Sequence, residues 1–554
     1  MPAPESKPLQ PLGNLALARA VGLEQPAKVL RRLTYVGGSR ERELIRDEDG
    51  VQRTERHLPA VYAPPAGDGL LGQVVFALKH EVPHFGLLEA VFRQVPPAEV
   101  AAYVAASPTG AYARRIGFLY EFLTGNDLTP LLKNVKIGGN YADLVDPAKL
   151  VTGEPRRDAR WRILNNLPGT RAYVPIIERT AAVEQTLNHD WHQEAAAALA
   201  VQRGNEGLLK RALNYLYYKE TRSSFEIERE TPSEARTARF VDVLKQAGQG
   251  SSSDALSEKV LTELQNLIVD ARYAEHGYRS NQNYVGSVVR WQNIVDYIPP
   301  PPDHLQDLMQ GLAQSVSRLG AEPLAQAAVA SFGLVFHHPF NDGNGRLHRY
   351  LLHDFMARSR LMPSGLALPV SAAILEDMPG YGRALEAFSE TVSVLVDYEL
   401  NERGELAILN AENAGWVWRH PDLTPQVEYL GRKLKAAVVM VAEEVSYLAQ
   451  YDALAARAKD VVDLPDRRLA DLLVLIHENH GHISNNKRKQ RFDELTNEEI
   501  AAIESAYAEV FQQPDQSIVP AGGAAQSPDA AVGGAPGAQQ ALPLQSPRKE
   551  SGGH

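Results

Sequence analysis

The chain has 554 residues, of which 44% are hydrophobic and 23% are charged, and its formal net charge at pH 7 is -11. This length leaves room for about three globular domains, and the acidic balance argues against a general polyanion binder. The absence of cysteine excludes disulfides, thiolate metal sites and a cysteine nucleophile. There is no secretory-signal pattern and no apolar run near the ~20 residues of a spanning helix, so a cytoplasmic protein without membrane contact is expected.

The first part of the chain predicts a tail followed by a mixed domain. Residues 1–20 are expected to be a flexible tail and residues 21–204 an N-terminal α+β domain. Short runs of β-branched and aromatic residues predict strands at LTYVGG (33–38), VVFALKHEV (74–82) and AYVPIIERT (172–180). No chemistry is predicted for this domain.

One helix of the N-terminal domain has a recognisable start signal. Ser107 has the side chain of an N-cap residue, and Pro108 is favoured in the first helical turn. The segment SPTGAYARRIGFLYEFLTGNDL (107–128) is therefore predicted to be a helix that is capped by Ser107.

Residues 205–400 are dominated by helical patterns. Apolar residues recur every three or four positions in LLKRALNYLYYKETRSSFEIERE (208–230), and EPLAQAAVASFGLVF (322–336) also predicts a helix. Between them, YVGSVVRWQNIVDY (284–297) predicts a β-hairpin, and the four prolines at 299–302 must be extended.

The remainder predicts a helical C-terminal domain at residues 401–513 and a disordered tail at residues 514–554. Thr496 and Glu499 have the spacing of a capping box, which predicts the start of the last helix. The tail is rich in Ala, Gly, Pro, Gln and Ser and cannot bury enough apolar surface to order itself.

The stretch HPFNDGNGRLHR (338–349) carries the most specific chemistry in the sequence. Gly343 and Gly345, with Asn344 between them, can direct successive backbone N–H groups at one point ahead of a helix, and such a nest binds phosphate. Arg346 and Arg349 lie three residues apart, on one helical face, and can hold the oxygens of a polyphosphate. Asn344 can also donate to a transferring phosphoryl oxygen.

Two further residues of this stretch supply a base and a metal ligand. His338 can accept a proton near neutral pH, and the Asp342 carboxylate suits magnesium that bridges two phosphates. Together these residues predict that a hydroxyl attacks a magnesium-bound nucleotide phosphate.

This stretch resembles the signature of the Fic family, HPFx[DE]GNGRxxR, and meets each of its fixed positions. The resemblance implies a mostly helical core over residues 205–400 that transfers AMP from ATP to a Ser, Thr or Tyr hydroxyl of a target protein, with release of pyrophosphate. It also implies a role for each residue of the motif. These roles are the base for His338, the magnesium ligand for Asp342, the anion hole for Gly343, Asn344 and Gly345, and phosphate binding for Arg346 and Arg349.

Two upstream segments resemble other parts of that family. Residues 279–298 are similar to its flap, a hairpin that holds the target segment by strand addition. In a helix at about 210–230, SFEIER resembles the inhibitory pattern [ST]xxxE[GN], with Ser224 and Glu228 four residues apart. By resemblance, Glu228 pairs with Arg349 and prevents productive seating of the γ-phosphate. Arg229 departs from the pattern, because the family has Gly or Asn there.

The predicted fold class is mainly α: a Fic-type helical core with a β-hairpin flap, between an N-terminal α+β domain and a helical C-terminal domain. The predicted function is AMPylation with ATP and Mg²⁺, and the target could be the chain itself. Alternatives are transfer of UMP, phosphocholine or phosphate, removal of AMP, and a non-catalytic nucleotide-sensing regulator that binds DNA through the C-terminal helices. A homodimer is left open, and nucleic acid is not an expected partner.

Overall fold

The computed structural model describes residues 9–38, 40–48, 51–200, 206–251, 254–290 and 292–511. The described residues fall into two compact units, and the residues of each unit mainly contact other residues of the same unit. The first contains the described residues of 1–192 and 217–437, and the second those of 193–216 and 438–511. The helices α8 (Trp191–Ala200), α9 (Glu206–Ile227) and α19 (Thr424–Val461) contribute residues to both units.

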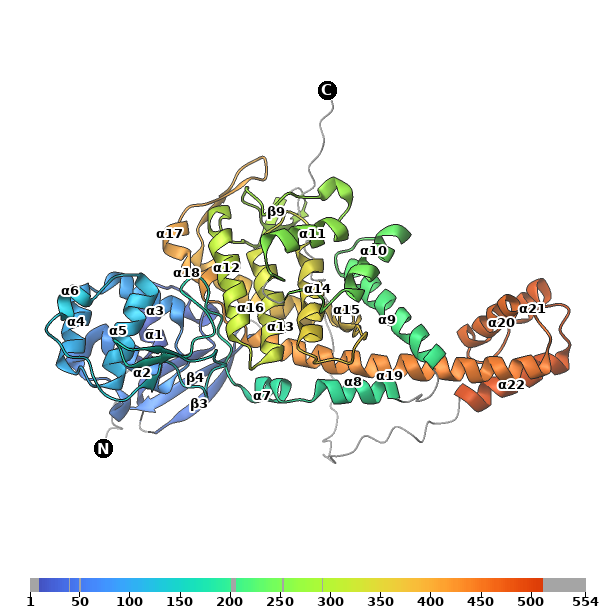
Figure 1. The fold of residues 1–554 in the computed structure, drawn as a ribbon, viewed down its shortest axis with the longest axis horizontal. Coiled ribbons are helices and arrows are strands. Elements are labelled where there is room, and N and C mark those ends of the chain that lie inside the picture. Colours follow the sequence, from blue (N-terminus) through green and yellow to red (C-terminus); the bar gives the residue numbers. More distant parts are fainter. Residues whose placement is uncertain are drawn as a thin grey trace, which may run out of the picture. The chain divides into compact units, whose positions relative to one another are not determined.

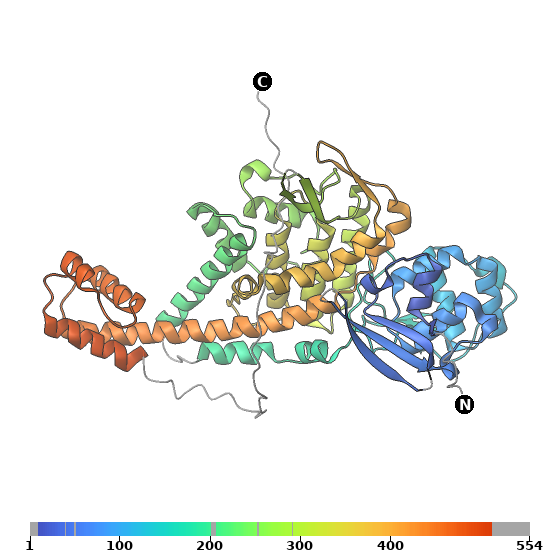
Figure 2. The same cartoon turned by 180° about the vertical axis from the view of Figure 1, so that it is seen from behind.

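The N-terminal part of the first unit contains a sheet in the order β1-β2-β4-β3. Strands β2 and β4 are parallel, with Thr34 opposite Arg56, and the other two pairs are antiparallel. Figure 2 shows the blue strands of this sheet running side by side. The strands are β1 (Gln10–Pro11), β2 (Arg32–Gly38), β3 (Arg42–Glu48) and β4 (Val51–Pro59).

Helices and a smaller sheet complete the N-terminal part. Apolar residues of α2, α3, α4 and α5 form its core, with Val91, Phe92 and Leu119 fully buried. The helices are α1 (Asn14–Ala20), α2 (Gly69–His80), α3 (Phe85–Gln94), α4 (Pro97–Ala106), α5 (Ala111–Thr124), α6 (Thr129–Leu132) and α7 (Ala181–Leu187). The smaller sheet has the order β5-β7-β6 and contains β5 (Ala142–Asp143), β6 (Arg156–Asp158) and β7 (Ile163–Asn165). Short 3-10 helices of this part are η1 (Pro26–Lys28), η2 (Ala60–Tyr62) and η3 (Ala66–Asp68), whereas η4 (Ala271–Tyr273) lies later in the chain, before β8.

The centre of the first unit is a helical core around α13 (Pro323–His337) and α14 (Asn344–Arg358) (Figure 1). Every residue of α13 from Leu324 onward is buried except Gln326, which marks a central helix, and Pro323 occupies its favoured position in the first turn. Helix α12 (Pro302–Arg318) packs against α13, and α14 follows α13 after a short loop. The other helices of this core are α10 (Glu234–Lys245), α11 (Glu258–Ile268), α15 (Val370–Leu375), α16 (Met378–Leu395), α17 (Ala411–Ala414) and α18 (Trp416–Arg419).

Two hairpins accompany these helices. Strands β8 (Val285–Val289) and β9 (Gln292–Tyr297) pair antiparallel, which confirms the hairpin predicted over residues 284–297. A second hairpin joins β10 (Tyr398–Leu400) and β11 (Leu406–Ile408).

The second unit is helical and has a separate apolar core, which includes Leu472, Ile476 and Ile503. Thr496 and Glu499 exchange hydrogen bonds at the start of its last helix, which confirms the predicted capping box. Beside the parts of α8, α9 and α19 that belong to it, its helices are α20 (Asp466–Glu478), α21 (Asn485–Arg491) and α22 (Asn497–Phe511). The mainly helical fold class is confirmed. Among the helices in the described part of the chain, none has both the length and the apolar character needed to cross a bilayer.

The flexible tail predicted for residues 1–20 is wrong where the structure describes it. From Leu9 onward the chain forms β1 and α1, and Leu15 and Leu17 are fully buried because this helix packs against α2 and α3. Residues 1–8 lie outside the described residues, as does the predicted tail at residues 514–554. The two units also divide the chain at places other than the predicted boundaries, because residues 401–437 belong to the first unit.

Three local predictions in the N-terminal domain were also wrong. Residues 74–82 lie mostly in helix α2, whose buried positions Leu71, Val74 and Leu78 recur with a helical period. Ser107 ends α4 rather than capping a helix, because the turn through Pro108 delays α5 until Ala111.

Residues 172–180 form no named strand. Pro175 lacks an N–H donor, and the segment instead pairs through isolated contacts such as the bridge between Ile176 and Asp422.

Candidate active site

The predicted phosphate-binding stretch forms the loop between α13 and α14. His338 ends α13 in the left-handed conformation, with a φ of 48°, and Gly343 precedes α14 with a φ of 91°. A Cβ at position 345 would lie 2.1 Å from Glu228 Oε1, so the Glu228 carboxylate keeps its present position only while residue 345 is glycine. The loop therefore brings the histidine to one end of the glycine turn and the N-terminus of α14 to the other.

Asn344 fixes the shape of this loop through hydrogen bonds of both its side-chain oxygen and its side-chain nitrogen. Its Oδ1 accepts from Phe340 N at 3.1 Å, and its Nδ2 donates to Phe340 O at 2.7 Å. Phe340 is fully buried, as an anchor of the loop should be. In this arrangement Asn344 holds the glycine turn closed, and its predicted donation to a phosphoryl oxygen stays a prediction.

Arg349 is held by the two residues of the predicted inhibitory pattern. Its Nε donates to Ser224 Oγ at 2.8 Å, and its Nη2 donates to Glu228 Oε1 at 2.8 Å and to the Ser224 carbonyl oxygen at 2.8 Å. Although burial disfavours the charged form, the Glu228 carboxylate raises the pKa of Arg349. The structure thus brings Ser224, Glu228 and Arg349 together, although 121 residues separate the paired charges in the sequence.

The other predicted phosphate arginine, Arg346, is also paired. Its Nη2 donates to Asp342 Oδ1 at 2.8 Å, and its Nη1 donates to Glu230 Oε2 at 3.0 Å. Asp342 Oδ1 also accepts from Gly343 N at 2.6 Å, which holds this carboxylate at the glycine turn. All nine predicted site residues therefore lie at the loop, at the start of α14 or at the end of α9.

His338 lies in surroundings that keep its imidazole neutral. Burial, with a contribution from the nearby Arg279 cation, lowers the pKa of His338 to about 4. Nδ1 lies 3.3 Å from Val335 O, so a proton on Nδ1 would be donated to that carbonyl. This tautomer leaves Nε2 able to accept a proton at pH 7.

Sequence reasoning missed Arg279, which connects the base of the β8–β9 hairpin to the loop. Its guanidinium donates to the carbonyl oxygens of His338 at 2.8 Å, Asn281 at 2.9 Å and Pro300 at 2.6 Å, and it is almost fully buried. Burial lowers the pKa of Arg279 to about 10, so it remains charged at neutral pH. A lone arginine in a polar segment has no pattern that would have identified it.

Replacing Arg279 with glutamine is expected to reduce stability and any activity that depends on His338. The shorter neutral side chain cannot reach all three carbonyl groups, and the unsatisfied acceptors should cost about 2–4 kcal/mol of unfolding free energy. Thermal melting and a transfer assay would measure both effects. Arg272→Gln is the matched control, because Arg272 is exposed on the same segment. Equal behaviour of the two variants would contradict the anchoring role.

The charged groups around the loop leave a surplus of donors. Arg236, Arg346 and Arg349 each have a buried guanidinium nitrogen without a hydrogen-bond partner, namely Nε, Nε and Nη1. Buried donors without partners are costly, and an anion with several oxygens would satisfy them. The donor set therefore fits a polyphosphate.

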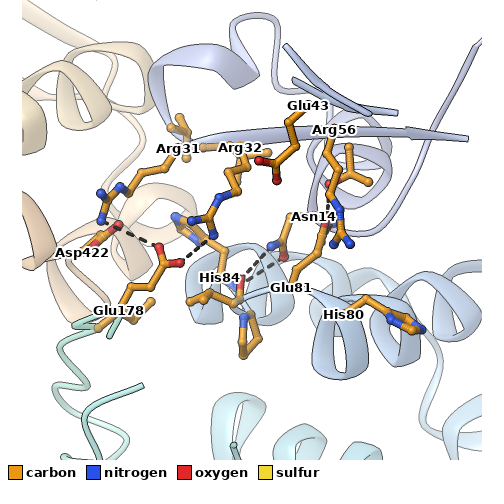
Figure 3. Close-up of a pocket in the computed structure, with 16 residues that line it drawn as sticks. Asn14, Arg31, Arg32, Glu43, Arg56, His80, Glu81, His84, Glu178 and Asp422 are labelled. Carbon is orange, nitrogen blue, oxygen red and sulfur yellow. Dashed lines mark hydrogen bonds and ion pairs between the residues drawn. The ribbon is translucent and has the colours of Figure 1, made fainter. Parts of the chain in front are cut away.

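A cavity of about 120 Å³ lies elsewhere, in the N-terminal part of the first unit (Figure 3). Two of its lining cations, Arg31 and Arg32, pair with the lining carboxylate of Glu178, and Arg32 Nη1 lies 2.5 Å from Glu178 Oε1. Burial raises the pKa of both Glu81 and Asp422 in its wall. It contains none of the residues predicted to carry the chemistry.

Comparison with known proteins finds a family match in the middle of the chain. The sequence profile of the Fic/DOC family matches residues 255–356, so the chain contains a Fic/DOC family domain there. The match includes the β8–β9 hairpin and the loop from His338 to Arg349, whereas Ser224 and Glu228 lie upstream of it.

Curated relatives include "Protein adenylyltransferase Fic" from Drosophila yakuba and from Drosophila willistoni. The chain is 28% identical to the first over 217 residues and to the second over 218 residues. Each alignment covers 34% of this chain and 42% of the relative, so the chain spans less than half of the length of these proteins.

Solved structures with similarity include a Fic family protein from Desulfovibrio desulfuricans G20, with a TM-score of 0.35 and 21% identity over 54% of this chain and 87% of that chain. Fic-1 from C. elegans (residues 134–508) gives a TM-score of 0.29 and 16% identity over 65% of this chain and 92% of that chain.

Proposed function

We propose that this chain, through its Fic/DOC family domain, transfers AMP from ATP to a hydroxyl side chain of a target protein. The observation that carries the proposal is the loop itself, where a neutral histidine, a glycine turn and two arginines meet. The adenylyltransferase relatives support the same reaction. The chain also has the expected residue at each fixed position of the Fic signature motif.

In the proposed AMP transfer, the loop supplies a base for the target hydroxyl and positive charge for the phosphate oxygens. The target hydroxyl oxygen attacks the α-phosphorus, the bond to the β-phosphate breaks, and pyrophosphate leaves. His338 Nε2 takes the proton of the hydroxyl, as a general base within the loop should. Arg346, Arg349 and the N-terminus of α14 would hold the negative charge on the phosphate oxygens.

Magnesium would be held by Asp342 together with the phosphates of the nucleotide. Among the described residues, no group of three or more His, Cys, Asp or Glu side chains is arranged to hold a metal ion. One carboxylate is sufficient for magnesium when substrate phosphates and water complete its octahedral shell. When bound, the ion supplies positive charge that neutralises the triphosphate.

The same site is proposed to be autoinhibited. Glu228 pairs with Arg349 and lies against Gly345, so its carboxylate occupies a position that the nucleotide phosphates would need. Arg229 has a φ of 55°, which explains why Gly or Asn suits this position of the family pattern, since both adopt positive φ at little cost. The departure at Arg229 therefore keeps the turn and leaves the Ser224–Glu228 pair in place.

ATP labelled at either the α- or the γ-phosphate tests the reaction. The full chain with Glu228→Gly would be incubated with a cell lysate, each labelled ATP and Mg²⁺. We expect the α-label on protein, either on a lysate target or on the chain itself, and the γ-label in released pyrophosphate. Protein that carries the γ-label would indicate phosphate transfer instead, and the absence of both labels would overturn the proposal.

A further inference from the structure

A second glutamate at the end of α9 pairs with the other phosphate arginine. Glu230 Oε2 accepts from Arg346 Nη1 at 3.0 Å and from Arg236 Nη2 at 2.9 Å. The side chain of Arg346 is only 1% exposed, whereas that of Glu230 is 31% exposed. One carboxylate oxygen therefore bridges two guanidinium groups.

Arg236 and Arg346 also share an aromatic neighbour. Their guanidinium carbons lie 5.1 Å and 5.4 Å from the centroid of the Phe225 ring, which fixes both cations near the same side chain. Phe225 is fully buried against Phe240 of α10, so the support is rigid. The position of Arg236 is thus set by packing as well as by Glu230.

The turn after α9 places both glutamates at once. Glu230 N donates to Phe225 O at 3.0 Å, and Arg229 N donates to Glu226 O at 2.9 Å, which is the hydrogen-bond pattern of a helix end closed by a left-handed residue. Glu228 therefore reaches Arg349 and Glu230 reaches Arg346 from the same short turn.

We infer that Arg236 and Arg346 form a second oxyanion subsite for the triphosphate, and that Glu230 occupies this subsite when the nucleotide is absent. The inference rests on the proposed function and assigns Arg236 as a further phosphate-binding residue. A carboxylate oxygen held by two guanidinium groups stands where a phosphate oxygen would have the same partners. The buried Nε of Arg236 has no partner of its own, which adds a donor for that ligand.

Equilibrium binding of ATP in the presence of Mg²⁺ tests the inference on the full chain. Glu230→Gln removes the competing charge and should tighten ATP binding about three- to tenfold, the range expected for a partly buried ion pair. Glu226→Gln is the matched control, because Glu226 is an exposed glutamate on the same helix. Binding of adenosine, which has no phosphate, should not change in either variant.

Arg236→Gln, made in the Glu230→Gln chain, separates phosphate binding from a structural role. It should weaken ATP binding about tenfold and leave adenosine binding unchanged. An equal loss for ATP and adenosine, or unchanged ATP binding in Glu230→Gln, would overturn the inference. Because these measurements need no transfer, a chain that binds as expected but fails to label protein would refute the proposed function and keep this subsite.

Discussion

Replacing His338 with alanine is expected to lower AMP transfer by at least ~10²–10⁴-fold, the contribution of a positioned general base. Without Nε2, the target hydroxyl has no proton acceptor at the loop, whereas the arginines and the glycine turn remain to bind the nucleotide. ATP affinity should therefore stay close to that of the parent chain. Transfer of α-labelled phosphate and equilibrium ATP binding, both in the Glu228→Gly background, would measure the two effects.

The control for this variant is His276→Ala, because His276 is exposed and lies on the segment that leads to Arg279. It should keep full transfer. The pH profile gives a second check: since the pKa of His338 is lowered to about 4, the base is neutral above that value and transfer should fall only as the pH approaches it. Transfer by His338→Ala at the rate of the parent chain would remove His338 from the role of base.

The residues from 338 to 349 could be located from the sequence because their chemistry is local. The glycine turn, the histidine before it and the arginines after it are fixed by short spacing, and the structure places them as that spacing predicts. Ser224 and Glu228 were identified because SFEIER resembles the inhibitory pattern of the Fic family, and their separation of four residues is consistent with one helical face. Their pairing with Arg349 had to come from the family pattern, since local geometry does not say which distant cation they meet.

Residues that reach the site only through tertiary contacts could not be recognised from short sequence spacing. Glu230 stands in the charged run EIERE, and Arg236 stands in the next helix, where both look like ordinary surface charges. Only the turn at Arg229 and the shared contact with Phe225 bring them to Arg346.

Helix α2 was mistaken for a strand for a related reason: its β-branched residues favour strands locally, but its helical period becomes visible only when Leu71 is included.

Replacing Glu228 with glycine is expected to raise AMP transfer by about 10- to 100-fold, including modification of the chain itself. The change removes the carboxylate that Arg349 Nη2 now contacts at 2.8 Å and frees the space beside Gly345. The Arg349 side chain is 2% exposed, so removal of Glu228 leaves a buried cation without its anionic partner. The vacated guanidinium should therefore favour the triphosphate, and the measurement is the initial rate of α-label transfer at a fixed ATP concentration.

The matched control is Glu226→Gly, which places the same flexible residue on the exposed face of α9 and should leave transfer at its basal rate. If both variants activate equally, loosening of the helix end explains the effect and the charge pair does not. If Glu228→Gly leaves labelling unchanged while still melting as a folded protein, Glu228 does not inhibit this site. Activation by Glu228→Gly alone would show that a carboxylate and a nucleotide phosphate compete for Arg349, which is the physical basis of the proposed autoinhibition.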